Sequence, residues 1–214
     1  MSDNFIETQY DITKKSRLLK FYESNKIFLY STILFLIILF FFIIFYLNNE
    51  EKKKISLSNQ YIQAKIYLEK EDKDEALKVL KNVVLADDPT YSTLSFFLIV
   101  NQNLITDYNE LTNLLDHLLK NNSYKNEIKD LLIYKKALLN LKLLDESQLL
   151  EITKPLINSD SIWKPHALLL LGDYFLSKKE YTKAQQFYSE ILAISSLHKD
   201  LYDQANSQLI ISNE

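Results

Sequence analysis

One uninterrupted apolar stretch, residues 27–47, constrains the fold of this chain more than any other feature. It contains no charged residue, no glycine and no proline. An α-helix of this length covers roughly 30 Å, which is the thickness of the hydrocarbon core of a bilayer. Tyr30 and Tyr46 lie near its two ends, where amphipathic rings prefer the headgroup level, and Ser31 and Thr32 can hydrogen-bond back to helix carbonyls. We therefore expect a transmembrane helix rather than the buried core helix of a soluble protein.

This stretch divides the chain into a short tail, residues 1–26, and a larger part, residues 48–214. A cleaved signal peptide is disfavoured, because the apolar region of such a peptide spans only about 7–15 residues and because the segment that follows Leu47 lacks a small-x-small cleavage site. The tail carries slightly more basic residues than the opposite flank, where Lys52–Lys54 are found. By the positive-inside rule we expect a cytoplasmic tail and a C-terminal domain outside the cytoplasm. The tail itself fits either a short amphipathic helix or a disordered segment.

The composition of the chain favours helices and excludes several other classes of protein. The net charge of −3 argues against a nucleic-acid-binding protein, which is usually basic. The absence of cysteine excludes disulfides and cysteine-ligated metal sites. With 1 glycine and 3 prolines, the chain has few residues suited to hairpins or phosphate-binding loops. Residues 48–214 therefore fit one all-α domain.

From residue 55 onward, the apolar periodicity predicts helices that are joined by short polar turns. The first pair of helices is separated by a polar turn at residues 69–74 and ends at Asp87-Asp88-Pro89. Further helices are expected at about 90–102, 106–120, 124–140, 145–158, 163–177, 180–195 and 199–211. Pro155 falls inside one of them and is expected to kink or shorten it.

The last third of the chain shows the clearest internal repeat. Gly172, the only glycine, is followed twelve residues later by Ala184, and Ala64 and Ala76 have the same spacing. Small residues at such positions let two helices approach closely, as in the 34-residue tetratricopeptide repeat. The expected fold is all-α: a single N-terminal transmembrane helix followed by an α-solenoid of about four tetratricopeptide-like helix pairs plus a C-terminal capping helix, residues 199–211.

The two middle copies of the repeat are degenerate. Leu111 and Leu149 occupy positions at which the pattern requires a small residue. Gly172 matches the pattern, and since an exposed glycine inside a helix costs about 1 kcal/mol relative to alanine, a packing reason for it is expected.

In repeats of this kind, the first helix of each pair lines a concave face that can hold a partner. Six residues occupy such positions, three in the first copy and three in the last: Tyr61, Lys65, Leu68, His166, Leu169 and Asp173. The alternative is that these residues only pack against the neighbouring repeat.

Sequence motifs for catalysis or cofactor binding are missing. His117 has an acidic neighbour that lies on another side of its helix, and His166 and His198 have no partner at a metal-ligand spacing. There is no glycine-rich phosphate loop, no nucleophile elbow and no zinc-binding helix motif. Trp163, at the start of a helix, is expected to anchor a core rather than to bind a ligand. We therefore expect no catalytic site, no metal and no cofactor.

Three sequence features together resemble one protein family. They are the start Met1-Ser2-Asp3-Asn4-Phe5-Ile6 before a single span, the segment from Asp160 to Ala167 with Lys154-Pro155-Leu156 upstream, and the terminal Tyr202-Asp203-Gln204-Ala205 helix. These features resemble bacterial membrane-anchored tetratricopeptide-like proteins related to the ancillary subunit of the Sec translocon. The resemblance implies an inner-membrane protein with a periplasmic repeat domain. It also implies association with translocon subunits and with a membrane-anchored periplasmic chaperone.

Two functions of different kind follow as hypotheses. In the first, the protein is a non-enzymatic interaction module that is tethered by residues 27–47 and holds a protein partner in its groove. In the second, it is a structural scaffold subunit of another envelope complex, for cell division or outer-membrane assembly. A large exposed apolar patch would favour the second hypothesis, and a polar groove the first. A membrane-bound enzyme is poorly supported.

Overall fold

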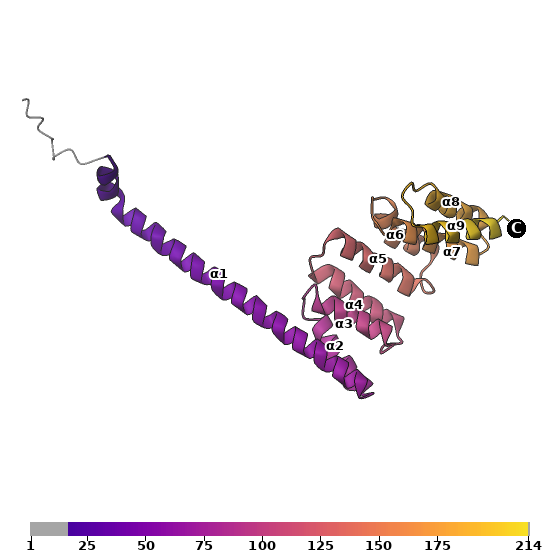
Figure 1. Cartoon of the computed structure of the whole chain (residues 1–214), viewed down its shortest axis with the longest axis horizontal. Coiled ribbons are helices and arrows are strands. Elements are labelled where there is room, and N and C mark those ends of the chain that lie inside the picture. Colours follow the sequence, from indigo (N-terminus) through magenta and orange to yellow (C-terminus); the bar gives the residue numbers. More distant parts are fainter. Residues whose placement is uncertain (1–16, 214) are drawn as a thin grey trace, which may run out of the picture. The chain divides into compact units, whose positions relative to one another are not determined.

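The computed structural model describes residues 17–213, and this part of the chain contains nine α-helices and no strand (Figure 1). The chain divides into two compact units, residues 1–53 and residues 54–214. Helix α1, Arg17–Glu69, runs through the boundary between them. Residues 1–16, which form most of the expected cytoplasmic tail, lie outside the described residues.

The first unit is dominated by the apolar part of α1. Among the described residues, this is the one helix long and apolar enough to cross a membrane, and none of its most apolar window is buried inside the protein. The hydroxyls of Ser31 and Thr32 both donate to the Phe28 carbonyl, at 2.9 Å, so their polar groups are satisfied within the helix. The backbone of Asn25 departs from helical geometry, with φ −121° and ψ 15°, and interrupts α1 just before the apolar stretch.

The second unit contains the end of α1 and eight further helices. Their bounds are α2 Lys73–Val84, α3 Tyr91–Asn101, α4 Tyr108–Asn121, α5 Asn126–Asn140, α6 Glu146–Ile157, α7 Lys164–Ser177, α8 Tyr181–Leu192 and α9 Lys199–Ile211. Most predicted helix ends are correct to within two residues, and α6 ends two residues after Pro155. Successive helices pack against each other from α2 to α9, and α7 also contacts α5 and α9.

The first polar turn is shorter than predicted. The sequence indicated a turn at residues 69–74, whereas α1 continues to Glu69 and α2 begins at Lys73. The reason is a helix stop that uses no glycine: Glu71 has φ 62°, and the Asp72 N–H donates to the Tyr67 carbonyl at 2.9 Å. This pattern is a Schellman motif, which satisfies the last carbonyls of the helix.

The same stop ends two other helices. Asn103 and Lys179 have φ 50° and 63°, after α3 and α7 respectively. In each case the next residue donates its N–H to a carbonyl five residues back, at 3.0 Å after α3 and 2.9 Å after α7. The chain therefore places charged or amide residues in the left-handed region, where glycine is the usual choice.

Two hydrophobic clusters form the core of the second unit. One contains Ala64, Phe96 and Leu115 with other residues of α1 to α4, and the other lies among α6 to α9. Helix α5 contributes to both, through Leu132 to the first and Ala137 to the second. Helix α5 therefore lies between the two clusters and contributes a buried residue to each.

Gly172 has the packing role that the sequence predicts. A Cβ atom built on it would lie 2.8 Å from Cδ1 and 2.9 Å from Cζ of Tyr188, a fully buried ring. Such distances are shorter than van der Waals contact, so the close approach of α7 and α8 requires a residue without a side chain here. Ala184, on α8, is also fully buried. At the degenerate positions, Leu111 and Leu149 are buried in spite of their size.

Candidate functional site

The candidate site lies around the start of α7, and local hydrogen bonds fix its backbone. The Ser161 hydroxyl accepts the Trp163 N–H at 3.1 Å, and the Ser161 carbonyl accepts the Lys164 N–H at 3.0 Å. Pro165 lies in the first turn of α7, where the N–H it lacks would have no helical partner. The turn and the proline together set the direction in which α7 begins.

Three rings join α5 to α7 at this point. Tyr134 stacks on Trp163, with ring centroids 5.7 Å apart and planes 18° from parallel. The centroid of the His166 ring lies 5.1 Å from that of Trp163 and 5.9 Å from that of Tyr134. The Trp163 indole also donates to the Glu127 carbonyl at 3.0 Å. Trp163 therefore links the beginnings of two helices from a half-buried position, and it belongs to neither hydrophobic cluster.

His166 belongs both to this aromatic cluster and to a cavity. Its Nδ1 is buried and has no hydrogen-bond partner in the described part of the chain. Burial lowers the pKa of His166 below its ordinary value, so the ring is neutral at neutral pH. Because Nδ1 is buried, Nε2 is the ring nitrogen left to donate or accept one hydrogen bond with a peptide group.

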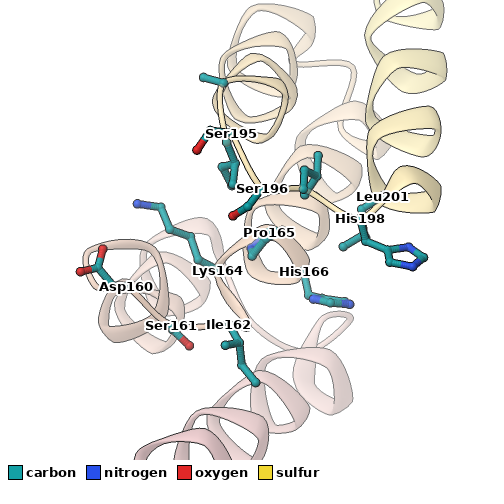
Figure 2. Close-up of a pocket in the computed structure, with 13 residues that line it drawn as sticks. Asp160, Ser161, Ile162, Lys164, Pro165, His166, Ser195, Ser196, His198 and Leu201 are labelled. Atoms are coloured by element: carbon teal, nitrogen blue, oxygen red, sulfur yellow. The ribbon is translucent and has the colours of Figure 1, made fainter.

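The cavity has a volume of about 620 Å³ and lies among the α6–α7 connection, the start of α7 and the α8–α9 connection (Figure 2). In Figure 2, His166 and His198 lie on one side of it, and Lys164 and Asp160 on the other, with Ser196 between them. Its apolar lining residues are Ile162, Pro165, Ala193, Ile194, Leu197 and Leu201. A cavity of this size, with an apolar lining and a few polar groups, falls within the usual range of binding pockets, about 300–1,000 Å³.

Asp173, two turns along α7, has a polar partner on α8. The Tyr188 hydroxyl donates to Asp173 Oδ1 at 2.8 Å. Burial raises the pKa of Asp173 above its ordinary value, and the hydrogen bond from Tyr188 partly opposes this rise. Burial also raises the pKa of Tyr134, and the charge of Asp173 raises it further, so this carboxylate acts on the aromatic cluster.

The six residues predicted to line a groove form two separate groups. His166 lines the cavity, Asp173 lies two turns farther along α7 and does not line it, and Leu169, with 9% of its surface exposed, belongs to the core cluster. The contacts of the described residues do not join this group to Tyr61, Lys65 and Leu68.

In the first group, Tyr61 packs near Tyr91 with ring centroids 6.4 Å apart. Lys65 is exposed and Leu68 is half-buried. These three residues lie near the end of α1 and are not part of the cavity.

The sequence did not indicate the contribution of the α8–α9 connection. Ser195, Ser196, His198 and Leu201 line the cavity although about 30 residues separate them from its other wall. Nothing in their spacing marks them, because their position depends on how two loops meet after the helices have packed.

The described residues contain no group of three His, Cys, Asp or Glu side chains that could hold a metal ion. His117 pairs with Asp87 at 2.9 Å, outside the cavity. His198, which lines the cavity, has its Nδ1 3.6 Å from Oδ2 of Asp200, which does not line it, and both side chains are largely exposed. The arrangement therefore supplies an amphipathic surface with polar groups at its rim.

Comparisons of the chain with protein-family models, with curated proteins and with solved structures found no match.

Proposed function

We propose that this protein is a membrane-tethered protein–protein interaction module, in which the apolar part of α1 anchors the helical domain to a membrane. The observation that carries the proposal is the cavity at the start of α7, where apolar residues and half-buried polar groups converge. Helix α7 contacts both α5 and α9, as the first helices of neighbouring repeats do, and this supports a repeat-like stack in the last part of the domain.

The cavity suits a short segment of a protein partner rather than a flat surface. Its apolar residues can accept one or two side chains, while the serine hydroxyls and the neutral His166 ring can hydrogen-bond the main chain of the segment. The tether raises the local concentration of partners held at the same membrane, so a weak contact is sufficient.

We further propose that the protein is an ancillary factor of the Sec translocon that cooperates with a periplasmic chaperone. The support for this partner is the family resemblance of the start of the chain, the segment before α7 and α9. In this proposal the protein is a single-pass inner-membrane protein whose tail is cytoplasmic and whose residues 48–214 form a periplasmic tetratricopeptide-like domain. The excess of basic residues before the apolar stretch supports this orientation.

A second candidate function is a scaffold subunit of another envelope complex. The observation that favours it is an exposed apolar stripe on α1, formed by Ile55, Ile62 and Ile66. An exposed apolar surface of this kind is a site for contact with another protein, although its small area alone does not distinguish a lasting contact from a transient one.

Photo-crosslinking of the full chain in its native membrane tests these functions. A crosslinking amino acid replaces Ser196 in the cavity, Tyr61 on α1, or the exposed Lys120 as a control. Recovery of translocon subunits and a periplasmic chaperone at Ser196, and not at Lys120, supports the interaction module. Recovery of a division or assembly complex supports the scaffold, and equal recovery at all three positions refutes the cavity as the binding site.

A further inference from the structure

The end of α1 has two apolar faces, and only one is covered by the domain. Leu57 and Ala64, seven residues apart, are buried in the second unit. Ile55, Ile62 and Ile66 are 54%, 52% and 44% exposed. At about 100° per residue these three isoleucines lie within roughly 40° of one another and on the side opposite Ala64. We call this second face the isoleucine stripe.

We propose that the isoleucine stripe pairs with the same stripe of a second copy of this chain, with the two helices parallel. The spacing of seven and four residues is that of a coiled-coil seam. Asn59 lies beside the stripe, about 40° from its centre, at a position where a single polar residue fixes the alignment of paired helices.

Charges beside the stripe favour the parallel arrangement. Measured around the helix from the centre of the isoleucine stripe, Glu69 lies about 40° to one side and Lys70 about 60° to the other. Lys65 lies on the same side as Glu69 but farther away, at about 80°. In a symmetric parallel pair, opposite flanks of the two copies face each other, so Glu69 of one copy meets Lys70 of the other. In an antiparallel pair, like flanks face each other, and these charges repel.

The same order of charges, an acidic residue followed by a basic one, is also found earlier in the sequence. Glu51-Lys52 precedes Glu69-Lys70 by 18 residues, which is five whole turns of a helix. An acidic residue on one flank and a basic residue on the other are thus found at both ends of the same helical face.

The size of the stripe indicates a partner that is already held nearby. Three half-exposed isoleucines offer far less than the roughly 800 Å² per partner of a stable interface in solution. A second copy anchored in the same membrane has the same direction and the same eight-residue distance from Leu47 to Ile55, so its stripe is presented at the same level.

Cysteine crosslinking in the native membrane tests the pairing, because the natural chain contains no cysteine. Full-length chains carry Ile55→Cys or Ile66→Cys, or Ser56→Cys as an exposed control about 100° around the helix from Ile55. After mild oxidation, I55C and I66C each shift to the mass of a disulfide-linked dimer and S56C does not, because only facing Cα atoms within about 7 Å can be bridged.

Three results would overturn the proposal. One is the absence of dimers at both stripe positions, and another is a dimer formed only when I55C and I66C chains are mixed, which indicates antiparallel pairing. The third is that the cysteines form no dimer and also fail to react with a water-soluble maleimide. This result would mean that lipid covers the thiols and that the isoleucine stripe lies against the bilayer surface. A second substitution, Ile62→Arg, should abolish the I55C dimer, whereas Ser56→Arg should retain it; equal dimer in both also refutes the pairing.

Discussion

Gly172→Ala should destabilise the domain, although the same change in most helices is stabilising. The added methyl group would meet the ring of Tyr188 at 2.8 and 2.9 Å, on a side chain that is fully buried and hydrogen-bonded to Asp173. Overpacking of this kind costs about 1–3 kcal/mol, and three close ring atoms place this site at the upper end. Alanine regains about 1 kcal/mol of helix propensity. The expected net loss is therefore about 1–2 kcal/mol in the free energy of unfolding.

Urea unfolding of the full chain in detergent, followed by the fluorescence of Trp163, measures this loss. Ser177→Ala at the exposed end of α7 is the control for helix propensity, and it should leave stability within about 0.5 kcal/mol of the natural chain. Tyr188→Leu removes the clashing ring, so Gly172→Ala should be much less harmful in that background. A gain in stability for Gly172→Ala alone would show that α7 and α8 can separate freely, and the packing argument would be wrong.

Three further changes test the site. Asp173→Asn should stabilise the protein at pH 7 and lose that advantage below pH 3.8, because a pKa raised by burial makes the natural chain lose stability as pH rises; equal thermal midpoints at pH 7 would contradict this. The pKa of His166, measured by NMR, should lie below 6.5 because folding lowers it, so the free energy of unfolding should fall as the pH drops below 6.5. His166→Gln should remove this pH dependence, and an unchanged pH profile in the variant would refute the reasoning. Trp163→Phe removes the hydrogen bond to Glu127 and should cost about 1 kcal/mol in thermal or urea unfolding, whereas no loss would show that stacking on Tyr134 alone holds α5 to α7.

Helix positions could be predicted from the sequence because apolar spacing and polar turns act locally. The spacing of Gly172 and Ala184 also indicated a close helix contact, since few other reasons place a lone glycine inside an apolar helix. The helix stops could not be predicted in detail. Lys179 adopts a conformation that its residue type disfavours, and two hydrogen bonds hold it there, from Lys179 N–H to the Leu176 carbonyl and from Glu180 N–H to the Phe175 carbonyl.

The site was predicted only in part, for a physical reason. The repeat position of His166 indicated a residue on the first helix of a pair, and His166 does line the cavity, whereas Asp173, predicted in the same way, does not. The other wall of the cavity comes from Ser196 and His198, in a connection whose conformation depends on how α8 and α9 pack. Loop conformation is set by contacts between elements, and no local pattern encodes it.

In helix α1, too, the sequence does not show which apolar face packs against the rest of the domain. Leu57 and Ala64 are seven residues apart, and so are Ile55 and Ile62, so periodicity alone marks both faces as apolar and does not distinguish them. The domain covers the face with Ala64, because a small residue there lets the other helices of the first cluster approach, whereas isoleucine at that place would hold them apart. The face with the three isoleucines is the one left exposed, although Leu57 on the covered face is equally large. The small side chain of Ala64, rather than apolarity, therefore distinguishes the face of α1 that packs inside the domain from the face that stays exposed.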